Sequence, residues 1–278
     1  MKKKVLLIFG TRPEAIKMAP LIHVLNADSR FHLKVCSTAQ HREMLDNVLE
    51  LLEIRPDYDL NIMKAGNELS DVTATIFSKL PPVIDECKPD VVLVHGDTTT
   101  SFVAAVSAYY KKIPVGHIEA GLRTDNIYSP WPEEVNRKIT ATVASHHFAP
   151  TEMAKVNLLS ENVDGNKIFV TGNTIVDTLF WVLEKIERDA DLKAELVMTF
   201  SHFNNQNPLI LVTGHRRENF GEGFEQICSA LKRIATVHPE CQIVYPAHLN
   251  PKVQEPVNRI LNAIDNIHII KPLDYISF

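Results

Sequence analysis

The sequence predicts an α/β protein built from two Rossmann-like domains. Short apolar, β-branched runs alternate with helix-length amphipathic segments along most of the chain. That alternation is typical of a mostly parallel sheet with helices on both faces. Some of the runs, such as Val91–Val94, are apolar at every position, as strands buried on both faces are.

A break in this alternation divides the chain into two series. The pattern loosens between about Arg188 and Asn207, where charged and amide residues are frequent, and it restarts at Leu209. We therefore expect a first domain over residues 1–172, a connection over residues 173–208, and a second domain over residues 209–278.

The elements follow from the runs in order. The expected strands are Val5–Phe9, Leu33–Ser37, Val91–Val94, Val115–Ile118, His147–Ala149, Ile168–Val170, Leu209–Thr213, Gln242–Tyr245 and Ile267–Ile270. The amphipathic segments between them predict helices, among them Pro13–Asn26, Arg42–Leu52, Thr100–Lys111, Glu133–Ala144, Met153–Leu159, Phe224–Val237 and Pro251–Ala263. The second series contains only three strands, so we expect the second domain to be incomplete.

The composition excludes several classes of protein. With 278 residues, 45% of them hydrophobic, the chain can bury one large core or two ordinary ones. A net charge of −5 gives no general attraction to nucleic acid or to an anionic membrane, so any anion site must be local. The apolar stretch after the first lysines ends at Gly10, too early for a signal peptide, and no stretch approaches a membrane span. We expect a soluble, cytoplasmic protein.

The cysteines indicate neither a metal site nor a disulfide framework. They form no CxxC pair and no Cys/His pattern, so we expect four reduced core residues, Cys36, Cys87, Cys228 and Cys241.

A polar cluster follows the first expected strand, where an open α/β sheet binds ligands. Gly10 permits a tight turn and Pro13 suits the first helical position, so the helix N-terminus can hold a phosphate group. Arg12 in the loop and Lys17 one turn inside the helix add positive charge. The motif is neither GxGxxG nor a P-loop, and a purely structural strand–turn–helix is the alternative.

Two carboxylates follow the next two central strands. Asp97 lies where a strand becomes a helix, and it is either an acid or base or only an N-cap. Glu119 follows the next strand, and the small residues Ala120 and Gly121 after it allow the backbone to approach a ligand closely. A surface loop is the alternative for Glu119.

A third carboxylate, Glu133, begins a helix after a loop that contains two prolines. Arg137 shares its helix face, and an ordinary surface salt bridge is the alternative interpretation of this pair. Together with Asp97 and Glu119, Glu133 forms a set of carboxylates on successive loops. Such a set can raise the pKa of its members and supply both a general base and a general acid.

The second series offers cations and histidines. The segment Thr213–Asn219 contains His215 and two arginines at a strand end, which suits phosphate and proton transfer unless it is a solvated turn. His248, at a later strand end, is either a ligand contact or a helix-start residue. Facing domains would place His215 opposite the carboxylates, with the active site in the interdomain cleft. This chemistry suits proton abstraction from a weakly acidic carbon or assistance to a leaving oxygen.

Seven segments carry a resemblance to a known family. They are Phe9–Lys17, Ala39–Leu45, His95–Thr99, Glu119–Thr124, Pro132–Arg137, Thr171–Thr174 and Gly214–Asn219. Taken together they resemble the non-hydrolysing UDP-N-acetylglucosamine (UDP-GlcNAc) 2-epimerases of bacteria, across essentially the whole chain. The resemblance implies a two-domain fold like that of GT-B glycosyltransferases, commonly a homodimer, and an isomerase that needs no cofactor and no metal.

The reaction that the resemblance implies interconverts UDP-GlcNAc and UDP-ManNAc, supplying ManNAc-type sugars for surface polysaccharide. UDP is eliminated across C1–C2 to give 2-acetamidoglucal and is then added back. By motif position the catalytic residues are Asp97, Glu119, Glu133 and His215, and the substrate-binding residues are Arg12, Lys17 and Arg137. Five further residues match a site where a second UDP-GlcNAc activates some members: Gln40, Arg42, Glu134, Arg216 and His248.

The chain also departs from the family pattern. Family members continue beyond the equivalent of Phe278 into an Asp-Ser-Gly-Gly segment with paired glutamates that helps to hold the nucleotide. The resemblance therefore implies weak or absent epimerase activity for residues 1–278. The alternative hypotheses are a GT-B glycosyltransferase and a truncated, non-catalytic sugar-nucleotide binder.

Overall fold

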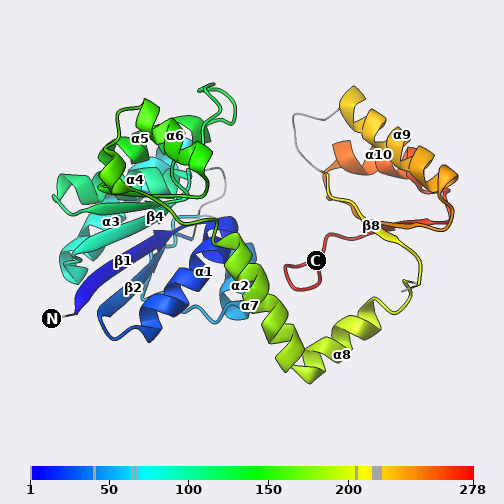
Figure 1. The fold of residues 1–278 in the computed structure, drawn as a ribbon, viewed down its shortest axis with the longest axis horizontal. Helices are drawn as coiled ribbons and strands as arrows, with labels where there is room; N and C mark the ends of the chain where they lie inside the picture. Colours follow the sequence, from blue (N-terminus) through cyan, green and yellow to red (C-terminus); the bar gives the residue numbers. More distant parts are fainter. Residues whose placement is uncertain (1, 40–41, 64–65, 67, 204–205, 215–220) are drawn as a thin grey trace. The chain divides into compact units, whose positions relative to one another are not determined.

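The computed structural model describes residues 2–39, 42–63, 66, 68–203, 206–214 and 221–278, which form two compact units, Met1–Trp181 and Val182–Phe278. Both units are of the α/β type that the sequence predicts (Figure 1). The division lies inside the segment 173–208 that we expect to be the connection. The two units are described separately below.

The first unit contains a seven-stranded sheet with the order β3-β2-β1-β4-β5-β6-β7, and all its strand pairs are parallel. The strands are β1 (Lys3–Phe9), β2 (Phe31–Ser37), β3 (Tyr58–Asp59), β4 (Val91–His95), β5 (Val115–Ile118), β6 (His146–Ala149) and β7 (Ile168–Val170). Every strand expected in this part of the chain is present. The additional strand β3 has two residues, which is too short to produce a period in the sequence.

Helices cover both faces of this sheet (Figure 1). Helices α1 and α2 lie on one face, and helices α3 to α6 lie on the other. Helix α7 lies beside α1 (Figure 1), where the Thr178 hydroxyl donates to the Ile16 carbonyl oxygen at 2.6 Å. The helices are α1 (Arg12–Ala27), α2 (Arg42–Leu51), α3 (Leu69–Cys87), α4 (Thr99–Tyr110), α5 (Glu133–Val143), α6 (Glu152–Ser160) and α7 (Ile175–Arg188). The chain changes face between α2 and α3, so β1 and β4 flank the switch point where such sheets bind ligands.

The core of the first unit lies between β1, β4 and the helices α3 and α4. Residues Val5–Phe9 of β1 are all buried, as expected for a central strand covered on both faces. Close packing also explains Gly10, which follows β1. A Cβ atom on Gly10 would lie 2.3 Å from the hydroxyl oxygens of both Thr38 and Thr100. Only glycine allows the β1–α1 loop to pass this close to α4.

The second unit contains a three-stranded parallel sheet with the order β10-β9-β8. Its strands are β8 (Leu209–Leu211), β9 (Gln242–Pro246) and β10 (Ile267–Ile270), and its helices are α8 (Ala190–Thr199), α9 (Glu222–Val237) and α10 (Pro251–Leu261). Phe224 and Tyr245 are the largest side chains of its core. Helix α8 lies in the stretch where the sequence pattern loosens. Its N-cap Asp189 accepts a hydrogen bond from the Leu192 N–H at 3.0 Å, so the connection is largely helical.

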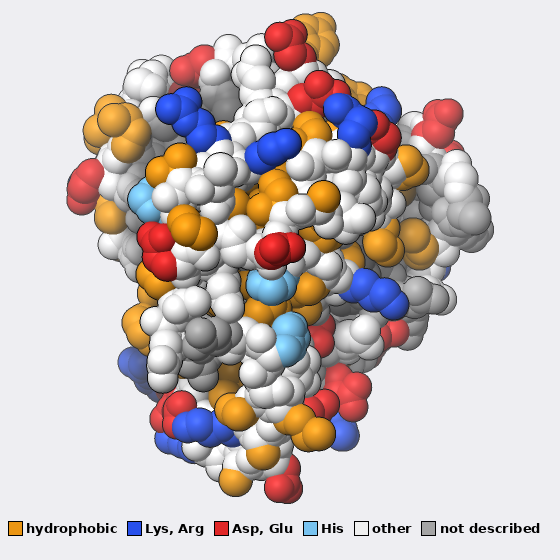
Figure 2. Space-filling model, turned by 90° about the vertical axis from the view of Figure 1, so that its right-hand side faces the viewer, with side chains coloured by type: hydrophobic (Ala, Val, Ile, Leu, Met, Phe, Trp, Pro, Cys, Tyr) orange, Lys and Arg blue, Asp and Glu red, His pale blue; other side chains and the backbone are white. Residues whose placement is uncertain are grey.

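The surface carries charges of both signs. On the face drawn in Figure 2, Lys and Arg side chains alternate with Asp and Glu side chains among the described residues. No helix in the described ranges combines the length and the apolar composition needed to cross a bilayer.

Candidate active site

Three loops of the first unit leave neighbouring strands at the same edge of the sheet. β1 pairs with β4, and β4 pairs with β5, so the loops that follow these strands lie next to one another. They carry Arg12, Asp97 and Glu119. Strand order thus groups residues that are far apart in the sequence.

Glu119 is held by several partners. Its side chain is 11% exposed, and Lys17 Nζ lies 2.8 Å and 2.6 Å from its two carboxylate oxygens. The Asn173 amide donates to Oε2 at 2.7 Å, and His95 Nε2 lies 3.8 Å from the same oxygen. These contacts exclude the surface-loop interpretation of Glu119. The backbone of Glu119 is in the left-handed region, with φ at 61°.

The pKa values at this cluster favour an ionised Glu119 beside a neutral His95. Burial alone would raise the pKa of Glu119, but His95, Lys17 and Asn173 together lower it. Burial lowers the pKa of His95 to about 4 against the opposing effect of Glu119. His95 is therefore uncharged near neutral pH, so Lys17 and Asn173 are the partners that keep Glu119 ionised there.

Asp97 is bound to Arg137 from helix α5. Arg137 Nη2 forms a short ion pair with Asp97 Oδ2, and the neighbouring Asn136 amide donates to the Asp97 carbonyl oxygen at 3.0 Å. Burial raises the pKa of Asp97, Arg137 opposes that rise, and the charges of Glu133 and Glu119 add to it. The N-cap of α4 is Thr98, so Asp97 is not the capping residue.

Glu133 and Glu134 start helix α5 and have different environments. Glu133 is half-buried, whereas Arg137 is buried. The two side chains do not form an ion pair, so the alternative of an ordinary surface salt bridge does not apply. Glu134 is fully buried. It accepts hydrogen bonds from the backbone N–H groups of Thr124 and Asp125, both at 3.2 Å, and lies 3.6 Å from Arg137 Nη1. In this conformation Glu134 orders the turn that precedes α5.

The β1–α1 loop carries Arg12 and a buried carboxyl group. Arg12 is half-buried at the first position of α1, with no ion pair to any residue that the structure describes. Glu14 accepts hydrogen bonds from the N–H groups of Gly10 and Thr11, and burial raises its pKa. Pro13 has no N–H group, so few backbone donors remain free at this helix start. The side chains of Arg12 and Lys17 are therefore the main cations available to a phosphate group.

The remaining residues of interest are placed as follows. His215, Arg216 and Gln40 lie outside the described residues. Arg42 is the first residue of α2. His248 is exposed after β9, where its Nδ1 accepts a hydrogen bond from the Asn250 N–H at 3.1 Å, and it precedes Asn250, the N-cap of α10.

Four residues of this region were not singled out by the sequence reasoning: Glu14, His95, Asn136 and Asn173. Glu14 had a signal, because Thr11-Arg12-Pro13-Glu14 has the Thr-x-x-Glu spacing of a capping box. The other three have no local signature, since their partners are distant in the sequence.

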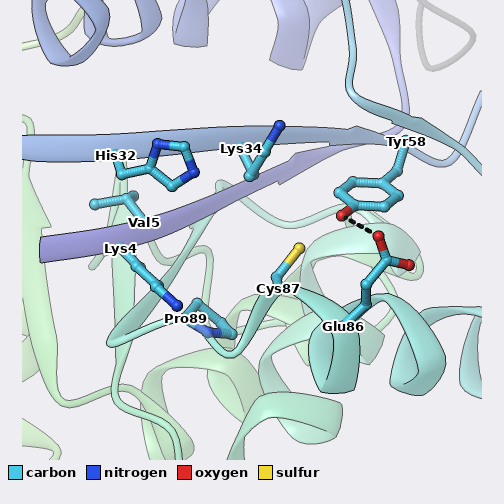
Figure 3. A pocket seen from close by; sticks show the side chains of 8 residues that line it. All are labelled: Lys4, Val5, His32, Lys34, Tyr58, Glu86, Cys87 and Pro89. Atoms are coloured by element: carbon cyan, nitrogen blue, oxygen red, sulfur yellow. Dashed lines mark hydrogen bonds between the residues drawn. The ribbon is translucent and has the colours of Figure 1, made fainter.

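The cavity drawn in Figure 3 lies elsewhere on the first unit. Its volume is about 210 Å³, and its lining includes Lys4 of β1, His32 and Lys34 of β2, and Cys87 at the end of α3. Within it the Tyr58 hydroxyl donates to Glu86 at 2.9 Å. Because Lys4 and His32 belong to the amino-terminal halves of their strands, this cavity is not at the carboxyl edge that carries Asp97.

The carboxyl edge can therefore carry out acid–base chemistry. It combines a carboxyl group with a raised pKa, Asp97, and an ionised one, Glu119, with the cations Arg12, Lys17 and Arg137 close by along the same loops and helices. Groups whose pKa values are moved in opposite directions are suited to acid and base roles in one reaction. The cations suit an anionic leaving group.

Known proteins are similar to this chain in sequence and in fold. The family pattern described as UDP-N-acetylglucosamine 2-epimerase matches residues 23–278. The UDP-N-acetylglucosamine 2-epimerase of Yersinia pestis is 60% identical over 275 residues, which are 99% of this chain and 73% of the relative.

Solved structures of UDP-GlcNAc 2-epimerases are also similar to this chain. The chain is similar to the UDP-GlcNAc 2-epimerase of Neisseria meningitidis bound to UDP-GlcNAc, with a TM-score of 0.90 and 52% identity over 99% of this chain and 74% of that one. It is also similar to the Methanocaldococcus jannaschii enzyme in complex with UDP-GlcNAc and UDP, with a TM-score of 0.77 and 33% identity over 99% and 75%. On this evidence the chain belongs to the UDP-N-acetylglucosamine 2-epimerase family.

Proposed function

We propose that this chain is an isomerase that interconverts UDP-GlcNAc and UDP-ManNAc. Removal of the C2 proton and breakage of the C1–O bond release UDP and leave 2-acetamidoglucal. Return of a proton to the opposite face of C2, with re-addition of UDP at C1, completes the inversion. The ligands of the solved relatives support the choice of substrate. The observation in this chain that carries the proposal is the placement of Asp97, paired with Arg137, and Glu119, paired with Lys17, after neighbouring strands. Their pKa values are shifted in opposite directions, as acid and base roles need.

The contacts suggest how the roles are divided. Both oxygens of Glu119 are engaged by Lys17, and one also by Asn173, so we assign Glu119 to holding Lys17 toward the diphosphate. Asp97 and Glu133 are the carboxyl groups left to exchange protons with C2, and inversion requires a proton-transferring group on each face of the sugar. His215 is proposed to act on the departing phosphate.

The test is incubation with UDP-GlcNAc in D2O, followed by NMR of the C2 position. We expect deuterium at C2 together with UDP-ManNAc. Asp97→Asn, which keeps the shape of the side chain, should lose exchange by at least about 100-fold.

Other outcomes would identify other functions. Transfer of the sugar to an acceptor without C2 exchange would indicate a glycosyltransferase. Free ManNAc with UDP would indicate a hydrolysing enzyme. Binding of UDP in calorimetry, with neither exchange nor product, would indicate a non-catalytic binder.

We also propose that the chain forms a homodimer and that a second UDP-GlcNAc acts as an activator at Gln40, Arg42, Glu134, Arg216 and His248. The support is the motif resemblance. The burial of Glu134 against the turn at Thr124 requires that turn to move before Glu134 can contact a ligand. Light scattering tests the dimer. A sigmoidal dependence of rate on UDP-GlcNAc tests activation, and a hyperbolic dependence would contradict it.

A further inference from the structure

The carboxyl group of Glu14 has no role in the reaction proposed above, although it is among the most enclosed polar groups of the first unit. Its residue is 2% exposed, and no cation of the described residues forms an ion pair with it. Oε2 accepts hydrogen bonds from the Gly10 N–H at 3.0 Å and from the N–H and hydroxyl of Thr11, both at 2.8 Å. This oxygen therefore binds the β1–α1 loop, which carries Arg12.

The other oxygen binds a different loop. Oε1 accepts from the Thr98 hydroxyl at 2.7 Å and lies 3.0 Å from the Ser101 hydroxyl oxygen. Thr98 and Ser101 form the start of α4, directly after Asp97. The carboxyl group of Glu14 thus joins two loops, and Glu14 and Thr98 are 84 positions apart in the sequence.

The Ser101 hydroxyl group ties this link to strand β4. It donates to the His95 carbonyl oxygen, at 2.5 Å, and to Glu14 Oε1. A hydroxyl group has one proton, so the two acceptors share it. Burial raises the pKa of Glu14, and the hydrogen bonds from Thr98, Gly10, Thr11 and Ser101 oppose that rise.

We propose that Glu14 is a positioning residue that sets the spacing between the Arg12 loop and Asp97, through the hydrogen bonds that its two oxygens accept from both loops. It contacts no substrate. The effect on turnover rests on the epimerase function proposed above. The link between the two loops is a property of the folded chain alone.

Three variants test the link. Glu14→Ala removes it. Glu14→Gln keeps the shape of the side chain and can keep the link, because its carbonyl can accept from Gly10 and Thr11 while its amide donates to the hydroxyl oxygens of Thr98 and Ser101. Val103→Ala is the control, since Val103 is a buried α4 residue of the hydrophobic core cluster and is not one of the residues that hydrogen-bond to Glu14.

The first readout is turnover. We expect kcat of Glu14→Ala to fall about 100-fold, the usual effect of displacing reacting groups by roughly 1 Å. Glu14→Gln should retain most of kcat, and Val103→Ala should lower the melting temperature with kcat unchanged. Equal loss of kcat in the Gln and Ala variants would show that the link between the two loops does not set the turnover rate. A loss of kcat in Val103→Ala as large as that in Glu14→Ala would show that Glu14 affects turnover only through the general stability of the fold.

The second readout needs no substrate. Amide hydrogen exchange at Gly10, Thr11 and Ser101 should accelerate together in Glu14→Ala and stay slow in Glu14→Gln and Val103→Ala. Acceleration confined to Gly10 and Thr11 would show that the two loops are not joined. If the unaltered chain exchanges no deuterium into C2 of UDP-GlcNAc, the proposed function fails, and the amide exchange still decides the link.

Discussion

The buried histidine His117 makes the stability of the first unit depend on pH. The His117 residue is 0% exposed, and Nε2 donates to the Gly96 carbonyl oxygen at 2.7 Å. Nδ1 has no hydrogen-bond partner among the residues that the structure describes. Burial lowers its pKa from the ordinary 6.5 to about 3. The unfolded chain therefore takes up a proton at this position as the pH falls below 6.5, while the folded chain does not. Stability is lost over that range, down to about pH 3.

The magnitude follows from the two pKa values. Between about pH 7 and about pH 5.5 the protonation of the unfolded chain at this one histidine lowers the free energy of unfolding by about 1 kcal/mol. This difference in free energy depends little on the pKa of His117 in the folded chain, because any pKa well below about 5.5 leaves the folded imidazole neutral over the whole range.

The perturbation is His117→Gln, whose amide can still donate to the Gly96 carbonyl oxygen but does not titrate. Urea unfolding at the two pH values, followed by fluorescence, reports on the first unit because both tryptophans, Trp131 and Trp181, belong to it. The variant should lose about 1 kcal/mol less than the unaltered chain between the two pH values.

Val94→Ala is the matched control. Val94 is buried on β4 at the position paired with His117, so its truncation should lower stability equally at both pH values. The reasoning is refuted if the chain with His117 and the Gln variant lose the same free energy of unfolding over this range.

Three further predictions concern the site and its loops. Glu119→Gln leaves Lys17 without its counter-ion and should lower kcat by about 100-fold or more in steady-state assays, with little change in melting temperature. An unchanged kcat would contradict the proposal that Glu119 holds Lys17 toward the diphosphate. Burial raises the pKa of Asp97 and Arg137 opposes that rise, so Arg137→Met should move the acidic limb of the pH–rate profile to higher pH. A limb that stays in place or moves down would show that Asp97 does not control it. Gly121→Ala should cost about 2 kcal/mol in urea unfolding, because φ is +91° and the new Cβ would lie 2.2 Å from a carbonyl oxygen of α6. A stability equal to that of the unaltered chain would mean that this turn relaxes freely.

Much of the fold could be predicted because its signals are local. Strands such as Val115–Ile118 and Ile168–Val170 have the bounds expected from their apolar runs. Helix α5 begins at Glu133 as expected after its two prolines. Strand β3 was missed because two residues carry no period, and α8 was missed because the charged and amide residues around it suggested an irregular connection.

The site was predicted less completely, because its contacts are between distant residues. The sequence placed Asp97 and Glu119 after neighbouring strands, which follows from where apolar runs end. It left a surface salt bridge between Glu133 and Arg137, at helical spacing, as the alternative to a site role, and the folded chain pairs Arg137 with Asp97 instead. A helical spacing shows which pairs are possible, and packing decides which of them forms.

By itself, then, the sequence determined the alternation of strands and helices, the residue types at each strand end, and the family. Only the tertiary structure decided which of those residues meet. The order β1-β4-β5 brings Lys17 to Glu119, 102 positions away, and brings Glu14 to Thr98. The physical reason is that hydrogen bonds and burial act through space. Two glutamates show this. Lys17 and Asn173 help to lower the pKa of the Glu119 carboxyl group, whereas burial among neutral donors raises the pKa of the Glu14 carboxyl group.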